Sequence, residues 1–127
     1  MLTKPIPSSG ESWPVIGLGI CRSFDIRLTR GKPKEPQKVL KLFFAAGGKV
    51  IDSSPMCGEA EDVTGDIIAS IDGRDQAFLA NTVWTRARQR GIAEMDNSLR
   101  LLRCSAIELM QIHNLVDCNT YLATLPL

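Results

Sequence analysis

The sequence lacks long apolar runs and lacks an excess of charge of either sign. Of its 127 residues, 15 are Lys or Arg and 14 are Asp or Glu, so the formal net charge is +1. Such a chain has no electrostatic reason to bind nucleic acid or an anionic membrane. No stretch reaches the length of a membrane span, and residues 1–5 contain no apolar run of the signal-peptide type. We therefore predict a cytoplasmic protein with no nucleic-acid or membrane partner.

The four cysteines lack the close, paired spacing of a metal or disulfide motif. Cys21, Cys57, Cys104 and Cys118 form no closely spaced pair. This pattern predicts neither a zinc knuckle nor a disulfide framework, so we expect reduced thiols. Cys57 precedes a predicted helix, whose N-terminus favours a thiolate, and it is the candidate for a reactive thiol. Cys104 and Cys118 are expected to be passive.

The chain alternates between strand-like and helix-like apolar patterns. Residues 5–14 are rich in Ser, Gly and Pro and predict turns, with a small hairpin around Ser9 and Gly10. Short apolar runs predict strands at 15–20, 49–53, 77–84 and 107–113. Helical stripes are expected from Val39, Leu42, Phe43 and Ala46; from Ala60, Val63 and Ile67; and from Ile92, Met95, Leu99 and Leu102. In the last strand one face is expected to carry Ile107, Leu109, Gln111 and His113, and a further helix is predicted from residue 120.

Strands that alternate with helices predict right-handed crossovers and a parallel sheet. A complete (β/α)8 barrel needs about 250 residues. The 127 residues therefore predict an α/β fold as a single domain, 1–127: a partial (β/α)8 TIM-type barrel with four parallel strands and three crossover helices. An open sheet of this kind has unpaired edges, so we expect a homodimer, or aggregation, through them.

Two of these strands end in side chains that can do chemistry. Asp52 ends one strand, and His113 with Asn114 ends another. In a parallel barrel the carboxyl ends of the strands form the active site. Two structural alternatives stay open: Asp52 as a turn former before residues 53–55, and His113 as a hydrogen-bonded core histidine.

A zinc site is a further alternative for the same end of the sheet. Thiolate, imidazole and carboxylate groups are suitable zinc ligands. The candidate ligands are Cys21, Asp52, Cys57 and His113. Their spacing is not a metal signature, so no metal is predicted.

Several segments, taken together, resemble the aldo/keto reductase family. They are residues 5–11, 15–19, 50–58, 78–80, 83–86 and 109–115. The resemblance covers nearly the whole chain but only the amino-terminal half of the family's barrel. It implies NADPH-dependent reduction of aldehydes and ketones, at a site that uses an Asp, a Tyr, a Lys and a His.

By motif position, the resemblance assigns roles to residues of this chain. The catalytic positions fall on Asp52, Cys57 in place of Tyr, Thr82 in place of Lys, and His113. The expected cofactor-binding positions are Gly19, Ile20, Cys21 and Asp52. The expected substrate-binding positions, for a small carbonyl compound, are Trp84, His113 and Asn114.

The two replacements predict impaired catalysis. Carbonyl reduction needs a hydride donor and an acid that protonates the developing alkoxide. Thr82 has no charge to assist a proton donor, and the shorter side chain of Cys57 displaces its proton, which alone can cost on the order of 100-fold in rate. Without the lysine, burial is expected to raise the pKa of Asp52.

Two hypotheses about function follow. One is a weak NADPH-dependent carbonyl reductase, although the chain contains no evident binding motif for the phosphates of the dinucleotide. The other is a non-catalytic, truncated fragment that acts as an interaction or regulatory partner of a full-length reductase.

Overall fold

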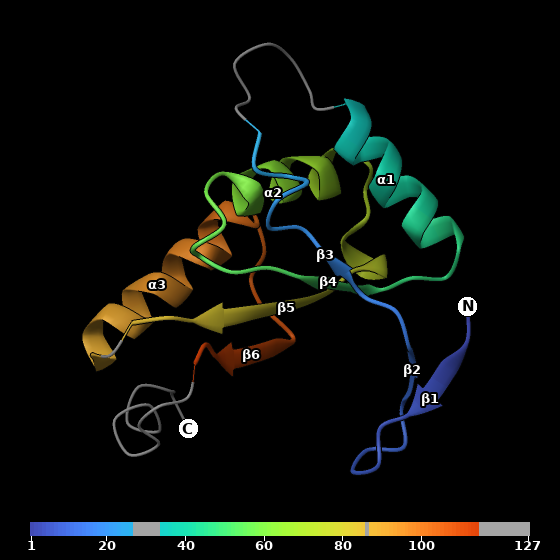
Figure 1. The fold of residues 1–127 in the computed structure, drawn as a ribbon, viewed down its shortest axis with the longest axis horizontal. Coiled ribbons are helices and arrows are strands. Elements are labelled where there is room, and N and C mark those ends of the chain that lie inside the picture. The colour runs from blue at the N-terminus through green and yellow to red at the C-terminus, as the bar shows by residue number, and fades with distance from the viewer. Residues whose placement is uncertain (27–33, 86, 115–127) are drawn as a thin grey trace.

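A computed structural model describes residues 1–26, 34–85 and 87–114 (Figure 1). In chain order the elements are β1 (Thr3–Pro5), β2 (Ser12–Pro14), β3 (Leu18–Gly19), α1 (Lys34–Ala45), β4 (Val50–Asp52), α2 (Ala60–Ser70), the 3-10 helix η1 (Arg74–Gln76), β5 (Phe78–Val83), α3 (Arg88–Leu101) and β6 (Leu109–Ile112). The helix predicted from residue 120 lies outside the described residues.

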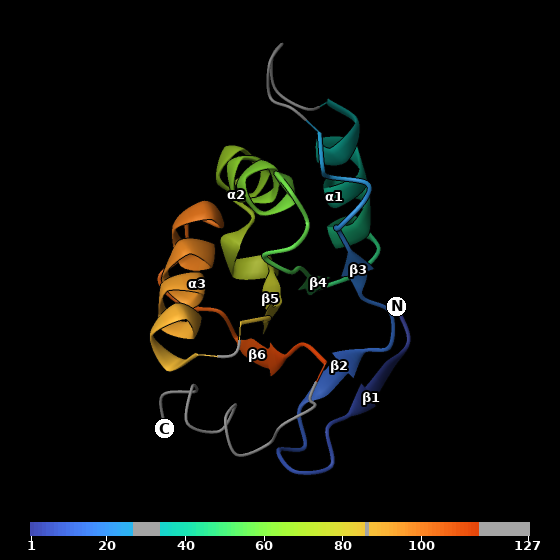
Figure 2. The same ribbon diagram turned by 60° about the vertical axis from the view of Figure 1, so that its left-hand side comes forward.

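The main sheet has four parallel strands in the order β3-β4-β5-β6. Each strand therefore lies beside its neighbour in the chain, as expected for right-handed crossovers in a barrel. The three helices lie together on one side of this sheet (Figures 1 and 2). The predicted α/β fold with four parallel strands and three crossover helices is confirmed.

The predicted hairpin is also confirmed. β1 and β2 pair antiparallel, with Thr3 opposite Pro14, and Gly10 in the turn has a φ of 75°, a conformation that glycine adopts without strain. Trp13 of β2 packs edge-on against Phe78, the first residue of β5, with 3.8 Å between ring centroids. The hairpin thus lies at the amino-terminal ends of the parallel strands.

The core fills the space between the sheet and the helices. Alternate residues of a strand point to opposite faces, and Ile51 and Leu79 pair in register on the face that the helices cover. The core side chains with less than 2% exposure include Leu40 of α1, Val63 of α2, and Ile51 and Leu79. Leu102, which follows α3, is 2% exposed and belongs to the same cluster.

Two of the expected helical stripes are corrected by the structure. In α1 the buried residues are Pro36 and Leu40, whereas Val39 and Leu42 are 43% and 61% exposed. Apart from Lys41, all the residues from 39 to 44 are apolar, so the sequence allows two competing buried faces of this helix. In α3 the buried residues are Gly91 and Ser98, and Ile92 is exposed. The rest of the expected α3 stripe is borne out in part, since Leu102 is buried and Met95 and Leu99 are half-buried.

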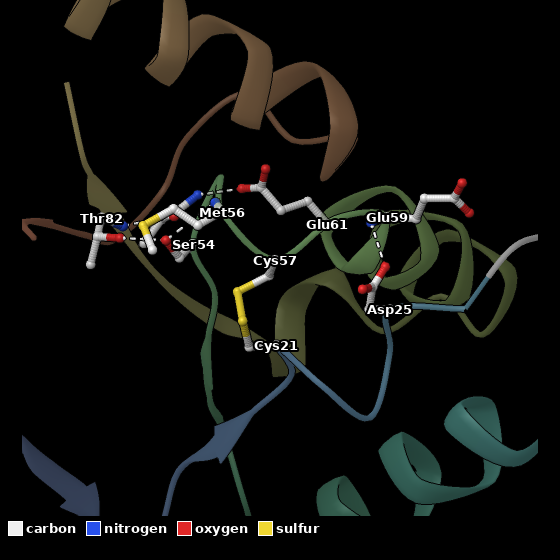
Figure 3. Close-up of a disulfide and its surroundings, with 9 residues drawn as sticks. Cys21, Asp25, Ser54, Met56, Cys57, Glu59, Glu61 and Thr82 are labelled. Atoms are coloured by element: carbon white, nitrogen blue, oxygen red, sulfur yellow. Dashed lines mark hydrogen bonds between the residues drawn. A yellow bond between two sulfur atoms is a disulfide. The ribbon is translucent and has the colours of Figure 1, made fainter.

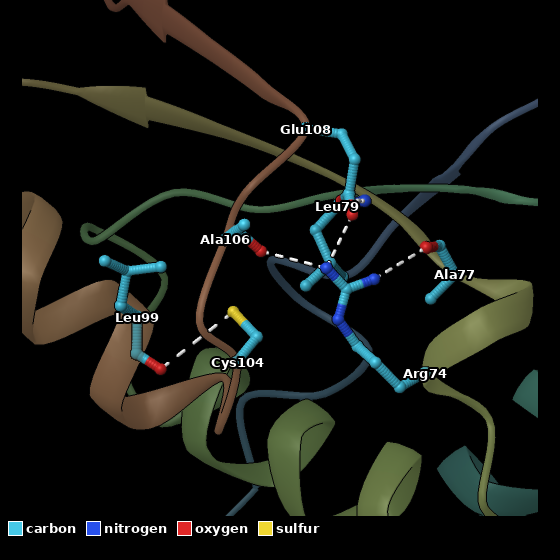
Figure 4. A network of polar contacts seen from close by, with 7 residues as sticks. All are labelled: Arg74, Ala77, Leu79, Leu99, Cys104, Ala106 and Glu108. Atoms are coloured by element: carbon cyan, nitrogen blue, oxygen red, sulfur yellow. Dashed lines mark hydrogen bonds and ion pairs between the residues drawn. The ribbon is translucent and has the colours of Figure 1, made fainter.

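The segment that leads into β6 is held by one arginine (Figure 4). Arg74 of η1 donates to the carbonyl oxygens of Ala77 and Ala106 and forms an ion pair of 2.5 Å with Glu108. The other carboxylate oxygen of Glu108 accepts the Leu79 N–H at 2.8 Å. These contacts fix the start of β6 against β5.

None of the helices in the described ranges has the length and apolar character needed to cross a membrane.

Candidate functional site at the carboxyl ends of the strands

Four of the predicted site residues lie at one edge of the sheet. Gly19 and Asp52 are the last residues of β3 and β4, Thr82 is the penultimate residue of β5, and His113 directly follows β6. Because the strands are parallel, these positions share the carboxyl edge, where parallel barrels place their active sites. The structure therefore brings Asp52 and His113 to the same end of the sheet.

The register also places these residues on one face. Gly19 pairs with Asp52 and Asp52 pairs with Ala80, so these residues share a face with Thr82, two residues further along β5. Thr82 pairs with Gln111, and the His113 N–H continues the ladder to the Val83 carbonyl oxygen at 2.9 Å. The face opposite to the helices thus carries Gly19, Asp52, Thr82 and His113.

Asp52 is open to solvent at the end of β4, yet its carboxyl group is partly desolvated. Burial raises the pKa of Asp52 above its ordinary value of 3.8. This result confirms the expected direction. The Asp52 carbonyl oxygen accepts the Ile20 N–H at 3.1 Å, which ties the end of β3 to the end of β4.

Thr82, which the resemblance assigns to the family's lysine position, is part of a network of uncharged groups. Its hydroxyl donates to the Ser54 hydroxyl at 3.0 Å, and its N–H donates to the side-chain oxygen of Asn81 at 2.7 Å. Asn81 in turn donates to the Glu61 carboxylate at 2.6 Å, in a position where both side chains are buried. No pattern in the sequence indicates that Ser54, Asn81 and Glu61 belong to the network around Thr82.

Cys57, which the resemblance assigns to the family's tyrosine position, has no free thiol in this structure. It forms a disulfide with Cys21, across 36 residues of sequence and 4.7 Å between Cα atoms (Figure 3). The expectation that Cys21 and Cys57 are reduced is therefore wrong. The loop after β3 meets the loop after β4 because these strands are neighbours, a proximity that linear spacing cannot reveal.

The disulfide also removes the zinc alternative. A sulfur that is bonded to another sulfur is not a thiolate ligand. No group of three or more His, Cys, Asp or Glu side chains suitable for a metal ion occurs in the described part of the chain. Cys104 is free and half-buried, and burial raises the pKa of its thiol, against a smaller opposing effect of Arg74.

A second tie joins the same two loops (Figure 3). The Asp25 carboxylate accepts the Glu59 N–H at 3.0 Å, just before α2. Gly58 has a φ of 59°, and a Cβ there would lie 2.3 Å from the Asp25 Oδ1, so this close approach requires glycine. No sequence signal pointed to this capping interaction.

His113 is half-buried, and its Nδ1 is buried without a hydrogen-bond partner among the described residues. A histidine held in a core by hydrogen bonds would have this nitrogen satisfied. Asn114 follows with a φ of 54°, a left-handed conformation that asparagine adopts more readily than most residues. The Trp84 side chain is 54% exposed beyond the end of β5.

The residues expected to bind the cofactor differ in whether a ligand can reach them. Gly19 is exposed, and a Cβ added there would meet nothing within 4 Å, so space is open above it. Ile20, by contrast, is fully buried in the core, and its side chain cannot border a ligand. The Cys21 sulfur is bonded to Cys57.

A surface hollow of about 370 Å³ lies elsewhere, at the opposite end of the sheet. It is lined by Glu11, Ser12, Trp13, Pro14, Lys49, Val50 and Phe78. Val50 and Phe78 begin their strands, so the hollow is separated from the candidate site by the length of the sheet. No pattern in the sequence indicates this hollow.

Solved structures share this fold. A protein from Pseudomonas aeruginosa assigned to the aldo-keto reductases matches with a TM-score of 0.79 and 21% identity, over 96% of this chain and 52% of its own. An aldo-keto reductase from Klebsiella pneumoniae in complex with NADPH matches with a TM-score of 0.71 and 24% identity, over 89% and 40%. The glycerol dehydrogenase AKR11B4 from Gluconobacter oxydans matches with a TM-score of 0.73 and 21% identity, over 87% of this chain and 38% of its own.

The chain thus spans about half the length of these structures or less. No curated protein sequence matches it. The model of the aldo/keto reductase family matches residues 15–126, which include all the strands of the parallel sheet. The chain belongs to the aldo/keto reductase family.

Proposed function

We propose that this chain forms the amino-terminal half of a site for reduction of aldehydes and ketones with NADPH, and that its catalysis is impaired. The observation that supports the proposal is the placement of Asp52, Thr82 and His113 on one face at one edge of the sheet. The impairment is inferred from the two replaced groups, because Cys57 is held in a disulfide and Thr82 in a hydroxyl pair.

The described residues fit one end of a nicotinamide cofactor and not the whole molecule. Open space above Gly19, beside Asp52 in the neighbouring strand, suits a flat ring or a ribose. The side chains of Ile20 and Cys21 are unsuitable, since one is buried and the other is bonded to Cys57. NADPH, when bound, supplies the hydride.

The residues of this chain would have to orient the carbonyl and provide the proton. A disulfide carries no proton to donate, and Thr82 offers no positive charge that stabilises a developing anion. His113 is the remaining acid, and its half-buried imidazole at the end of β6 can donate a hydrogen bond to a carbonyl oxygen. A site with this one donor is expected to reduce carbonyls slowly.

The test is restoration of the missing groups. The variant Cys57→Tyr with Thr82→Lys is compared with a matched control, Cys57→Phe with Thr82→Met, which has similar volumes but no acidic hydroxyl and no charge. NADPH binding is measured by calorimetry at millimolar cofactor, and oxidation of NADPH is followed with a small aldehyde. We expect a rate at least about tenfold above both the control and the unmodified chain.

Two results would contradict the proposal. An unmodified chain as fast as the restored variant would show that catalysis is not impaired. Absence of NADPH binding in all three proteins would remove the reductase function.

The open sheet edges favour a second candidate function, as an interaction module. In the part of the chain that the structure describes, β3 pairs only with β4 and β6 pairs only with β5. Unpaired edge strands attract further strands. We propose that a second copy pairs along these edges, or that a full-length reductase does so.

Light scattering after size-exclusion chromatography tests the homodimer. The 13.9 kDa chain is expected to elute with about twice its mass, as for a closed pair. Leu109→Lys on β6 should weaken the dimer, whereas Leu42→Lys on the exposed face of α1 should not. A stable monomer at all concentrations would contradict self-association.

A further inference from the structure

The Cys21–Cys57 disulfide joins the two loops that border the candidate site. Cys21 follows β3 and Cys57 lies between β4 and α2, so the bond crosses the carboxyl edge of the sheet (Figure 3). Nothing in the proposed carbonyl chemistry uses this bond. The two cysteines that form it differ sharply in their access to solvent.

Cys21 is an exposed residue, whereas Cys57 is only 4% exposed. Thiol–disulfide exchange requires a thiolate to approach one sulfur of the bond, and access decides which sulfur it attacks. A small thiol in solution can therefore reach Cys21, whereas the burial of Cys57 keeps the thiol away from the second sulfur. The buried Cys57 then becomes the leaving group.

The loops have contacts that do not depend on the disulfide. Phe24 is fully buried in the core, and its N–H donates to the Ile20 carbonyl oxygen at 3.0 Å. Asp25 accepts the N–H of Glu59, two residues after Cys57, at 3.0 Å. These contacts should hold Cys21 near Cys57 after the bond is broken, so that it can form again.

We propose that Cys21–Cys57 is a reversible thiol–disulfide exchange site for small monothiols, with Cys21 as the attacked sulfur. A thiolate forms a bond to the Cys21 Sγ, the Cys21–Cys57 bond breaks, and its electron pair leaves on Cys57, which takes a proton from water. A second thiolate attacks the thiol-derived sulfur of the mixed disulfide and releases Cys21. Two electrons have then passed to the protein, and the monothiol has become its disulfide.

This exchange does not require NADPH or a carbonyl substrate, so it is independent of the proposed reductase function. Reduction would free two thiols at the edge of the sheet that carries Asp52. Oxidation would return the bond that holds the two loops together. The site would thus respond to the thiol status of its surroundings.

The experiment is differential alkylation of the whole chain, followed by peptide mass mapping that quantifies each cysteine separately. Before reduction, Cys21 and Cys57 should be unlabelled, and Cys104 should become labelled on unfolding. With reduced glutathione as the probe, the mixed disulfide should be found on Cys21 at least about tenfold more often than on Cys57. When oxidised glutathione then replaces reduced glutathione, it accepts the two electrons in the reverse exchange, and the labelled fraction of both cysteines should fall again.

A matched pair of variants tests the preorganised loop. Asp25→Ala removes the tie to the Glu59 N–H and should slow closure several-fold without changing which sulfur carries the adduct. Asp75→Ala replaces an exposed aspartate on η1 and should leave closure unchanged.

Three outcomes would overturn the proposal. One is free Cys21 and Cys57 in protein purified under air. A second is the glutathione adduct mainly on Cys57, and a third is reduced chain that does not close again.

Discussion

Asn81 and Glu61 form a hydrogen bond of 2.6 Å between two side chains that are buried from water. Asn81 lies in β5 and Glu61 in the first turn of α2, so the bond joins the sheet to the helix that follows the disulfide loop. The Asn81 side-chain oxygen also accepts the Thr82 N–H. Through this residue the core is connected to the candidate site.

Removing Asn81 should therefore destabilise the fold. Asn81→Leu leaves a buried carboxylate without its donor, and we expect a loss of about 2–3 kcal/mol in the free energy of unfolding. Glu61→Gln keeps an oxygen acceptor for Asn81 and should cost less. Urea denaturation of the two variants measures the difference, and equal losses would contradict the assignment of the bond.

The disulfide should contribute strongly to stability. Closing a loop between cysteines 36 residues apart restricts the unfolded chain and is expected to stabilise the fold by about 3–4 kcal/mol. Cys21→Ser with Cys57→Ser should lower the free energy of unfolding by that amount. Cys104→Ser serves as the control, and a double variant as stable as the control would show that the bond does not form.

Close packing of α2 against the end of α3 requires glycine at position 65. A Cβ there would lie 2.2 Å from the Leu101 carbonyl oxygen, which is backbone and cannot rotate away. Gly65→Ala should cost about 1–3 kcal/mol in thermal or urea unfolding. Gly19→Ala, where nothing lies within 4 Å, should leave stability almost unchanged and yet weaken NADPH binding. Equal effects of both substitutions on stability would contradict this packing.

The raised pKa of Asp52 predicts a pH dependence of stability. Above its raised pKa the carboxyl is charged in both the folded and the unfolded chain, and the folded state carries the desolvation cost. As pH falls through that pKa the folded state takes up the proton first, so stability rises. Asp52→Asn should therefore be more stable than the unmodified chain at pH 7, with a gain that shrinks on acidification and vanishes below the ordinary value of 3.8. If the stability gained by Asp52→Asn instead grew as the pH fell, the pKa of Asp52 would be lowered in the folded chain and not raised.

The sequence predicted the sheet and its carboxyl edge because both depend on local pattern. An apolar run that stops at a polar residue, as at Asp52 and at His113, indicates where a strand ends, and this does not depend on the rest of the fold. The contacts between Cys21 and Cys57, or Asp25 and Glu59, depend on which loops meet in space, and linear spacing contains no such information. The buried face of α1 was ambiguous because Val39 and Leu40 both belong to apolar stripes.

Titration of the chain with NADPH, followed by two-dimensional NMR of the backbone amides, shows where on the sheet the cofactor binds. We expect the amide signals of Gly19, Asp52, Thr82 and His113 at the carboxyl edge to shift, while those of Trp13 and Phe78 beside the opposite hollow stay unchanged. Shifts confined to Trp13 and Phe78, or no shifts at millimolar NADPH, would contradict this expectation.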